Sequence, residues 1–391
     1  MSVTSVSLTE SLDTVLRESV ESGLIPGVVA LAATSDGVVY EGSFGPRVLG
    51  TDTAMTTDTV FWLGSMTKMI VAIGALQLVE RGKLSLDAPL GTLLPQLAEP
   101  QVLEGFDDDG LPVLRAARTA VTLRHLLTHT AGNGYHFWNA DVLRYQEVMG
   151  LPGIIECREA TLTTPLTFDP GTAWQYGMNL DWVGKAIEKV SGVSLEDYLR
   201  EALLDPLGMS DTTFVLTAGI SARLAGMHAR TPDGLVPVEF EMTQEPEFQM
   251  GGGAMYGSAR DYLTLLRMLL GRGELGGVRV LSEDSVDEAL RNQIGGLRIG
   301  LIASVDPASS NDVDLLPGID KTWGLLGLRN EAPGTQGRSA GSLFWAGLGN
   351  TYFWVDHGSD DCGLLCTQIL PFADQAVLDT FDSFERTVHH R

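Results

Sequence analysis

One apolar segment, residues 66–79, constrains the fold of this chain more than any other part of the sequence. Within it only Thr67, Lys68 and Gln77 are polar, and it ends at Glu80-Arg81-Gly82. A helix that is apolar on nearly all sides lies inside a protein, and a glycine often follows the last turn of a helix. The segment therefore predicts a buried central helix that carries a lysine.

Ser65 stands three residues before Lys68 and gives the pattern S-x-x-K at the start of the predicted helix. Residues three apart leave the same face of a helix, so the hydroxyl and the amine are able to meet. Burial lowers the pKa of a lysine and lets it act as a base, and N–H groups at a helix N-terminus favour an oxyanion. The pattern alone occurs by chance in many chains. A lysine inside an apolar helix is rare, because burying a charge is costly. The hypothesis is a serine nucleophile with a lysine base.

The composition excludes several classes of function. With 391 residues, 44% of them hydrophobic, and 45 glycines, the chain is expected to be a large globular α/β protein. A net charge of −24 argues against partners with a phosphate backbone and against anionic membrane surfaces. Three cysteines supply neither a disulfide framework nor a tetrahedral metal set. Cys362 and Cys366 are expected to be buried small residues.

The N-terminal residues 1–23 carry charges at short intervals and lack the apolar core of a signal peptide. No apolar run is long enough to predict a membrane span. We therefore expect a cytoplasmic protein.

The predicted elements form an α/β part with a helical insertion. Strands are expected at 28–33, 38–42, 342–347, 351–356 and 363–368. Helices are expected at 8–22, with Thr9 as N-cap, and at 122–132, with Thr122 as N-cap. Further helices are expected at 180–190, ended by Gly192, at 195–204, through Leu270 with Ser258 as N-cap, and at 372–388. Glycines around 322–327 favour a loop there. The sequence predicts an α/β domain with an antiparallel sheet at 1–82 and 226–391, and a mostly helical subdomain at 83–225.

Four motifs, taken in order, resemble a known enzyme group. They are S-M-T-K at 65–68, T-x-R-H-L-L-T-H-T-A-G at 122–132, P-G-T-x-x-x-Y at 170–176, and W-A-G at 345–347. Together they are similar to the serine hydrolases of the class C β-lactamase superfamily, most of all to family VIII carboxylesterases and related acyltransferases. The resemblance runs from about residue 8 to the C-terminal helix. It implies a β-lactamase/penicillin-binding-protein-like fold with the active site between the sheet domain and the helical subdomain.

The resemblance also implies roles for individual residues. Ser65 would be acylated, and Lys68 and Tyr176 would act as general base and acid. A phenol held between a lysine and a hydroxyl is able to be partly ionised. The backbone N–H groups of Ser65 and Leu348 would form the oxyanion hole. Spacing by itself would equally describe Tyr176 as an aromatic residue of the core.

Two positions depart from the β-lactamase pattern. Trp345 stands where β-lactamases have a lysine that suits a substrate carboxylate, and an indole supplies no such charge. Met178 stands where they have an asparagine, with Asn179 one residue later. The resemblance places Trp345, Gly347 and Asn179 at the substrate. Four further aromatic residues are candidate lining of the pocket, although each is as consistent with the core: Trp62, Tyr135, Phe137 and Trp138.

Other motifs in the chain point elsewhere. Residues 337–341 fit G-x-S-x-G with Ser339 at the centre, but that elbow needs a strand before it and a helix after it. His125 and His129 lie four apart without the glutamate of H-E-x-x-H, so no metal is expected. The glycines at 251–253 lack a following Gly-Lys-Ser/Thr, so no phosphate loop is predicted. We expect no cofactor.

The expected function is hydrolysis of small to medium carboxylic esters through an acyl-Ser65 intermediate. Alternatives on the same fold are acyl transfer to an alcohol, or a weak β-lactamase or D-alanyl peptidase. A binding protein without catalysis is a different class, and the intact Ser65, Lys68 and Tyr176 set argues against it. The natural acid, the alcohol and the number of subunits stay open.

Overall fold

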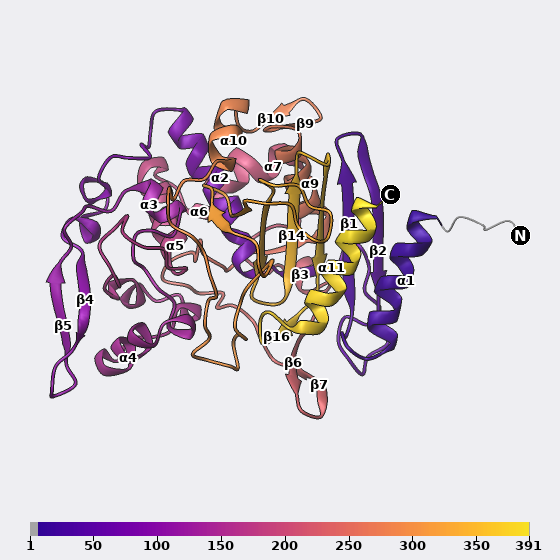
Figure 1. Cartoon of the computed structure of the whole chain (residues 1–391), viewed down its shortest axis with the longest axis horizontal. Coiled ribbons are helices and arrows are strands. Elements are labelled where there is room, and N and C mark those ends of the chain that lie inside the picture. Colours follow the sequence, from indigo (N-terminus) through magenta and orange to yellow (C-terminus); the bar gives the residue numbers. More distant parts are fainter. Residues whose placement is uncertain (1–6, 391) are drawn as a thin grey trace, which may run out of the picture.

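The computed structural model describes residues 7–390, and its centre is an antiparallel sheet of seven strands (Figure 1). The strand order is β11-β12-β13-β14-β15-β1-β2. β15 near the C-terminus pairs with β1 near the N-terminus, so the sheet joins the two ends of the chain. The strands are β1 Val28–Thr34, β2 Gly37–Phe44, β11 Lys321–Trp323, β12 Leu328–Asn330, β13 Leu343–Gly347, β14 Thr351–Asp356 and β15 Asp361–Cys366.

Helices cover both faces of this sheet. The terminal helices α1 (Leu8–Glu21) and α11 (Gln375–His389) pack against each other beside it. Successive side chains of a strand point to opposite faces. Tyr352 of β14 stacks on Phe381 of α11, whereas the next residue, Phe353, contacts α9 (Ala259–Leu270). α9 and α11 therefore cover opposite faces.

The predicted buried central helix is confirmed as α2, Thr67–Glu80. Every residue from Thr67 to Leu78 is buried. A short 3-10 turn, η1 (Gly64–Met66), precedes the helix and carries Ser65. α2 packs against α5 (Asn179–Ser191) and α6 (Leu195–Leu199), so its apolar surface is shared between the sheet-bearing part and the helices of the insertion.

Most of the short helices lie within residues 83–225. We propose that this segment is a subdomain. Its elements are η2 Leu90–Thr92, η3 Pro95–Leu97, β4 Gln101–Phe106, β5 Pro112–Ala116, α3 Leu123–Leu127, η4 His136–Trp138, α4 Ala140–Met149, η5 Ile154–Glu156, η6 Glu159–Thr163, α5, α6, η7 Arg200–Leu204, α7 Asp205–Leu207 and α8 Ala218–Ser221. The remaining elements are β3 Val60–Trp62, β6 Met227–Thr231, β7 Gly234–Val238, β8 Tyr256–Ser258, β9 Glu274–Leu275, β10 Val278–Arg279, α10 Glu283–Leu290 and β16 Ile369–Leu370.

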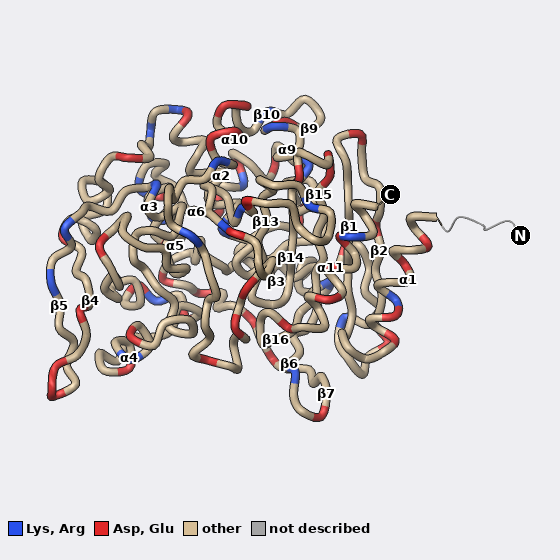
Figure 2. The backbone as a smooth tube through the Cα atoms, viewed as in Figure 1, with Lys and Arg blue, Asp and Glu red and all other residues tan. Residues whose placement is uncertain are grey.

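Two local predictions were wrong. The segment 321–330 forms strands β11 and β12, because Gly324 and Gly327 make the turn between them and the edge of β13 offers a partner. Ser7, and not Thr9, caps α1, because its side chain and that of Glu10 form a reciprocal capping box. The sequence analysis made no prediction of the hairpin β4–β5 at residues 101–116, whose acidic tip projects from the helical part (Figure 2).

Other local predictions are confirmed. Thr122 and Ser258 cap α3 and α9 with their side chains, and Gly192 ends α5 in the left-handed conformation. Cys362 and Cys366 are buried free thiols. Among the described residues no helix combines the length and apolar character needed to cross a membrane.

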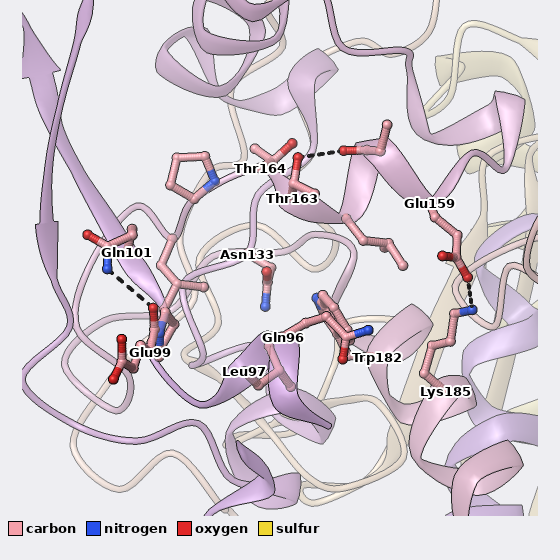
Figure 3. Close-up of a pocket in the computed structure, with 15 residues that line it drawn as sticks. Gln96, Leu97, Glu99, Gln101, Asn133, Glu159, Thr163, Thr164, Trp182 and Lys185 are labelled. Atoms are coloured by element: carbon pink, nitrogen blue, oxygen red, sulfur yellow. Dashed lines mark hydrogen bonds and ion pairs between the residues drawn. The ribbon is translucent and has the colours of Figure 1, made fainter. Parts of the chain in front are cut away.

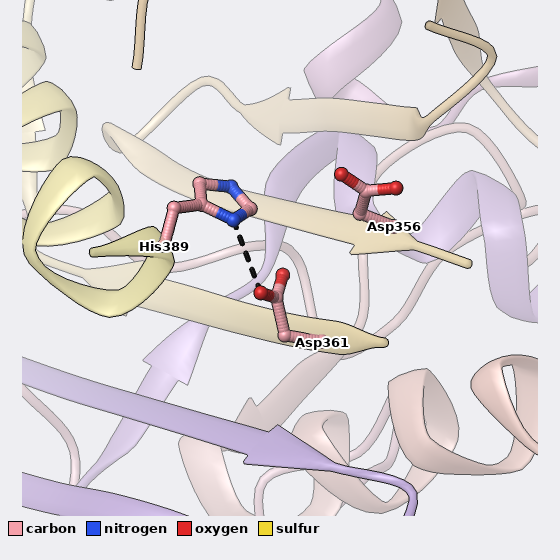
Figure 4. Close-up of side chains that lie close together, drawn as sticks. All are labelled: Asp356, Asp361 and His389. Atoms are coloured by element: carbon pink, nitrogen blue, oxygen red, sulfur yellow. Dashed lines mark ion pairs between the residues drawn. The ribbon is translucent and has the colours of Figure 1, made fainter. Parts of the chain in front are cut away.

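A buried charge cluster joins α11 to the sheet. His389 Nδ1 lies 3.0 Å from Asp361, with Asp356 beside them (Figure 4). His389 Nε2 lies 3.3 Å from Glu385, which forms a two-point ion pair with Arg338. Both oxygens of Asp356 already accept backbone N–H groups of Ser339, Gly358 and Ser359. The cluster is thus balanced by Arg338 and a charged histidine, and does not need a metal ion.

We expect His389→Gln to destabilise the protein in a pH-dependent way. Hydrogen bonds to Asp361 and Glu385 outweigh burial and raise the pKa of His389 to about 9. A raised pKa gives stability that is fully present below the ordinary histidine pKa and is lost as pH rises through about 9. The wild type should therefore exceed the variant by roughly 3 kcal/mol at pH 6 and by less at pH 10, measured by urea unfolding.

His357→Gln is the matched control. Burial lowers the pKa of His357, so replacing it should leave the loss of stability at high pH unchanged. A difference between wild type and His389→Gln that stays constant from pH 6 to pH 10 would contradict the charged state assigned to His389.

Candidate active site

Ser65 and Lys68 meet at the start of α2. The 3-10 turn η1 places the Ser65 hydroxyl beside the helix, and Lys68 Nζ lies 3.0 Å from Ser65 Oγ. Lys68 is 4% exposed, although its amine would carry a charge in water. Serine and amine are therefore held at hydrogen-bond distance inside the protein.

Two further groups hold the amine. Lys68 Nζ donates to the Gly252 carbonyl oxygen at 2.5 Å and to the Tyr135 hydroxyl at 3.1 Å. A neutral amine has two N–H bonds and one lone pair. With its two N–H groups on Gly252 and Tyr135, the lone pair of neutral Lys68 points at the Ser65 hydroxyl, which is the arrangement that a general base requires.

Burial sets the protonation of this site. It lowers the pKa of Lys68 to about 7, and the negative charge of Asp181 acts in the opposite direction. Asp181 itself is fully buried in the first turn of α5, and burial raises its pKa. Its Oδ1 accepts the Gly252 N–H at 2.8 Å, whereas its Oδ2 has no hydrogen-bond partner in the part of the chain that the structure describes. Gly252 thus bonds to the lysine through its carbonyl and to the aspartate through its N–H.

Tyr176 lies against the same pair. Its ring centroid is 4.7 Å from Lys68 Nζ, and its hydroxyl accepts a 2.7 Å hydrogen bond from the indole nitrogen of Trp345. Burial raises the pKa of Tyr176, against smaller opposite effects of its hydrogen bonds to Ser65 and Trp345. The raised pKa favours the neutral phenol, which is a proton donor, over the partly ionised phenol that the resemblance implies.

The backbone around the predicted oxyanion hole is tightly packed. A Cβ on Gly64 would lie 2.8 Å from the Leu348 nitrogen, and one on Gly347 would lie 2.1 Å from the Leu63 carbonyl oxygen. The end of β13 therefore approaches η1 closely only because both residues are glycines. This contact brings the N–H of Leu348 next to the turn that carries Ser65.

Three of the four aromatic residues predicted to line the pocket pack beside Tyr176, and the fourth, Trp62, packs on Phe240. Tyr135 and Trp138 have their rings 5.9 and 5.5 Å from that of Tyr176, and Phe137 stacks on Tyr135. Trp62 packs on Phe240 and donates to the Gly253 carbonyl.

Asn179 is fully buried and is bonded to neighbouring side chains. Its amide nitrogen bonds to His129 and to the Asn133 carbonyl, and its oxygen accepts from the Asn133 side chain. The ring of His129 lies 4.4 Å from that of Tyr176. As placed, Asn179 supports Tyr176 through His129 and has no free group for a substrate.

A cavity of about 410 Å³ lies in the helical part, away from Ser65. Figure 3 shows Asn133 at its centre and the ion pair of Lys185 with Glu159 at one side. None of Ser65, Lys68, Tyr176 or Trp345 lines it.

The Ser339 motif does not form a nucleophile elbow. The loop before β13 carries it, and a strand follows where the elbow needs a helix. Ser339 Oγ contacts Ser359 Oγ at 3.1 Å, and His389 is engaged by Asp361 and Glu385. His125 and His129 also serve structure, since His125 completes the cap of α3.

Comparison with known proteins bears directly on this site. The family model described as Beta-lactamase matches residues 12–380 of the chain. The chain belongs to the Beta-lactamase family. Among curated proteins, the lovastatin esterase of Penicillium rubens is 31% identical, over 97% of this chain and 98% of its own. The monacolin J acid methylbutanoyltransferase of Aspergillus terreus is 32% identical, over 97% and 95%.

Solved structures of this family confirm the fold. A mutant of simvastatin synthase from Aspergillus terreus matches with a TM-score of 0.84 at 31% identity, covering 98% of this chain and 95% of that one. EstCE1, a hydrolase with promiscuous acyltransferase activity, matches with a TM-score of 0.77 at 22% identity, over 97% and 98%, which supports the fold alone. The predicted resemblance to esterases and acyltransferases of the β-lactamase superfamily is confirmed.

Sequence reasoning missed two members of the site, Asp181 and Gly252. Asp181 carries little signal in the sequence, because Lys185 and Glu188 follow it on the same face of α5, so the spacing describes a solvated acidic residue. Gly252 also gives only a weak signal in the sequence, since a run of glycines suggests no more than a close approach of the backbone to another group. A Cβ there would lie within 3.0 Å of both carboxylate oxygens of Asp181 and within 2.8 Å of the Tyr135 hydroxyl.

We expect Asp181→Asn to move the acidic limb of the pH–rate profile to lower pH. The carboxylate favours the ammonium form of Lys68, so its removal lowers the pKa of the amine further and frees the base at lower pH. A shift of about one pH unit in kcat/KM for a p-nitrophenyl ester is the expected size.

Asp261→Asn provides the control, because Asp261 is a buried aspartate of α9 that bonds to Thr212 and the backbone of Asp211. The pH–rate profile of Asp261→Asn should keep the acidic limb of the wild type. An unmoved limb in Asp181→Asn would show that the carboxylate does not act on the group that limits activity.

Proposed function

We propose that this Beta-lactamase family member is a serine esterase that hydrolyses small to medium carboxylic esters through an acyl-Ser65 intermediate. The observation that carries the proposal is the 3.0 Å contact between the Ser65 hydroxyl and a buried amine of lowered pKa. The esterase and acyltransferase names of the relatives support it. A family VIII type of carboxylesterase and a cytoplasmic location are parts of the proposal that rest on the sequence.

Acylation uses the neutral forms of Lys68 and Tyr176. Ser65 Oγ attacks the ester carbonyl and its proton passes to Lys68 Nζ, while the N–H groups of Ser65 and Leu348 hold the oxyanion. The C–O bond then breaks, and the leaving alcohol takes the proton of the Tyr176 hydroxyl. The resulting phenolate is stabilised by the Lys68 ammonium and by the Trp345 N–H.

Deacylation reverses these transfers. A water molecule gives its proton to the Tyr176 phenolate and attacks the acyl carbonyl. Ser65 Oγ leaves with the proton that Lys68 has held, so all three groups return to their first state. An alcohol in place of water gives acyl transfer by the same steps, which makes acyltransferase the second candidate. The methylbutanoyltransferase among the relatives supports this second candidate.

The surroundings of the site favour an apolar ester over a β-lactam or a D-alanyl peptide. Trp345 occupies the position where a cation would meet a substrate carboxylate, and its N–H is engaged by Tyr176. Tyr135, Phe137 and Trp138 are aromatic, uncharged and buried beside Tyr176. We expect a small-molecule ester as the partner, with no nucleic acid and no membrane.

The test replaces each candidate nucleophile. Ser65→Ala should lower kcat/KM for p-nitrophenyl butyrate by roughly 10³-fold or more, because a missing nucleophile disables the whole set. Ser339→Ala should keep most activity, since Ser339 Oγ bonds to the Ser359 hydroxyl, away from Ser65. Labelling with a fluorophosphonate, followed by intact mass and peptide mapping, should place the label on Ser65.

An active Ser65→Ala with an inactive Ser339→Ala would overturn the assignment. Adding a primary alcohol to the wild-type reaction and measuring the transferred ester separates the two candidates. Products that contain only the free acid support the hydrolase, and transferred ester at low alcohol concentration supports the acyltransferase.

A further inference from the structure

A second cavity, of about 140 Å³, lies between α11 and the sheet. Its walls are mostly apolar: Leu315, Leu316, Phe344, Tyr352, Leu378 and Phe381. Phe344 pairs with Trp354, whose ring contacts Phe381 of α11. The next residue, Trp345, directs its indole to Tyr176 on the other side of the strand. The cavity and Ser65 are therefore on opposite faces of the sheet.

Two buried polar groups at this cavity lack partners among the described residues. Arg338 is 1% exposed, and it binds Glu385 through Nε and Nη2, which leaves Nη1 without an acceptor. Gln336 is 5% exposed, and its Oε1 accepts no hydrogen bond. Both residues line the cavity. A buried donor and a buried acceptor left unpaired cost stability, so a molecule that satisfies both would bind favourably.

The charges around the cavity argue against an anion. Arg338 is already neutralised by Glu385, and Asp314 is paired with Lys321 at 2.7 Å. Asp382 also lines the cavity and adds negative charge. A carboxylate would meet this charge, whereas a hydroxyl accepts from one neighbour and donates to the other.

The volume limits the size of the occupant. A cavity of about 150 Å³ lined by aliphatic and aromatic side chains holds a benzene molecule. We propose that the cavity between α11 and the sheet binds a neutral, single-ring alcohol or phenol, whose hydroxyl accepts from Arg338 Nη1 and donates to Gln336 Oε1. Because Trp345 also lines the cavity, the occupant touches the strand that supplies a hydrogen bond to Tyr176.

Phenol and toluene test this site, because they differ only by a hydroxyl in place of a methyl group. The full chain carrying Ser65→Ala keeps ester chemistry out of the measurement, which is binding by titration calorimetry and the rise in thermal midpoint. We expect one saturable phenol site and roughly tenfold weaker toluene binding, the value of about one or two net hydrogen bonds.

Two variants locate the site. Leu378→Trp fills the cavity from a half-buried position of α11 and should abolish phenol binding. Leu290→Trp makes the same change at a half-buried leucine of α10 and should leave phenol binding unaltered. Gln336→Leu should bring phenol down to the affinity of toluene, which keeps the test decisive where Leu378→Trp fails to fold.

Equal binding of phenol and toluene would overturn the proposal, as would phenol binding that survives both Leu378→Trp and Gln336→Leu. Absence of saturable phenol binding would show that the cavity holds solvent only. These outcomes are independent of esterase activity, so they leave the proposed function to its own test.

Discussion

The structure depends on keeping one amine inside an apolar helix. Lys68 lies in a segment whose every residue from Thr67 to Leu78 is buried, and a charge without partners there would cost several kcal/mol. The Gly252 carbonyl, the Tyr135 hydroxyl and the field of Asp181 reduce that cost without removing it. The remaining penalty lowers the pKa of the amine, so the unfavourable part of the burial is what makes Lys68 a base.

Elements from distant parts of the chain supply these partners. Tyr135 and Asp181 come from the segment 83–225, and Gly252 and Trp345 come from after it. His129 packs on Tyr176 with φ at +57°, a conformation that is costly for a residue with a side chain. Such strain persists only where the surrounding contacts hold the backbone, which is consistent with a tightly fixed site.

The two faces of the sheet treat buried charge differently. Beside α11, Arg338, Glu385, His389 and Asp361 neutralise one another and fasten the last helix to the strands. Beside α2, among the described residues 7–390, Lys68 has no ion pair within contact distance and Asp181 Oδ2 has no hydrogen-bond partner. Ion pairs in contact stabilise the fold on one face, while on the other face an amine of lowered pKa is available for proton transfer.

Local signals were enough for much of this protein. Some features depend only on neighbours in sequence, so the sequence predicts them correctly. They are the apolar run, the caps at Thr122 and Ser258, and the spacing of Ser65 and Lys68. The strands β11 and β12 were not, because their short, glycine-rich sequence becomes a strand only when β13 offers its edge. The raised pKa of Tyr176 also depends on burial, which the spacing of residues in the sequence does not reveal.

Neighbouring residues alone specify the central helix and the meeting of a serine with a lysine one turn later. The groups around that amine depend on how distant segments pack. Asp181 and Gly252 meet it through contacts between segments far apart in the chain, and the field at Lys68 depends on burial and distance in three dimensions. Periodicity describes the faces of one element, and it carries no information about which other element will lie against them.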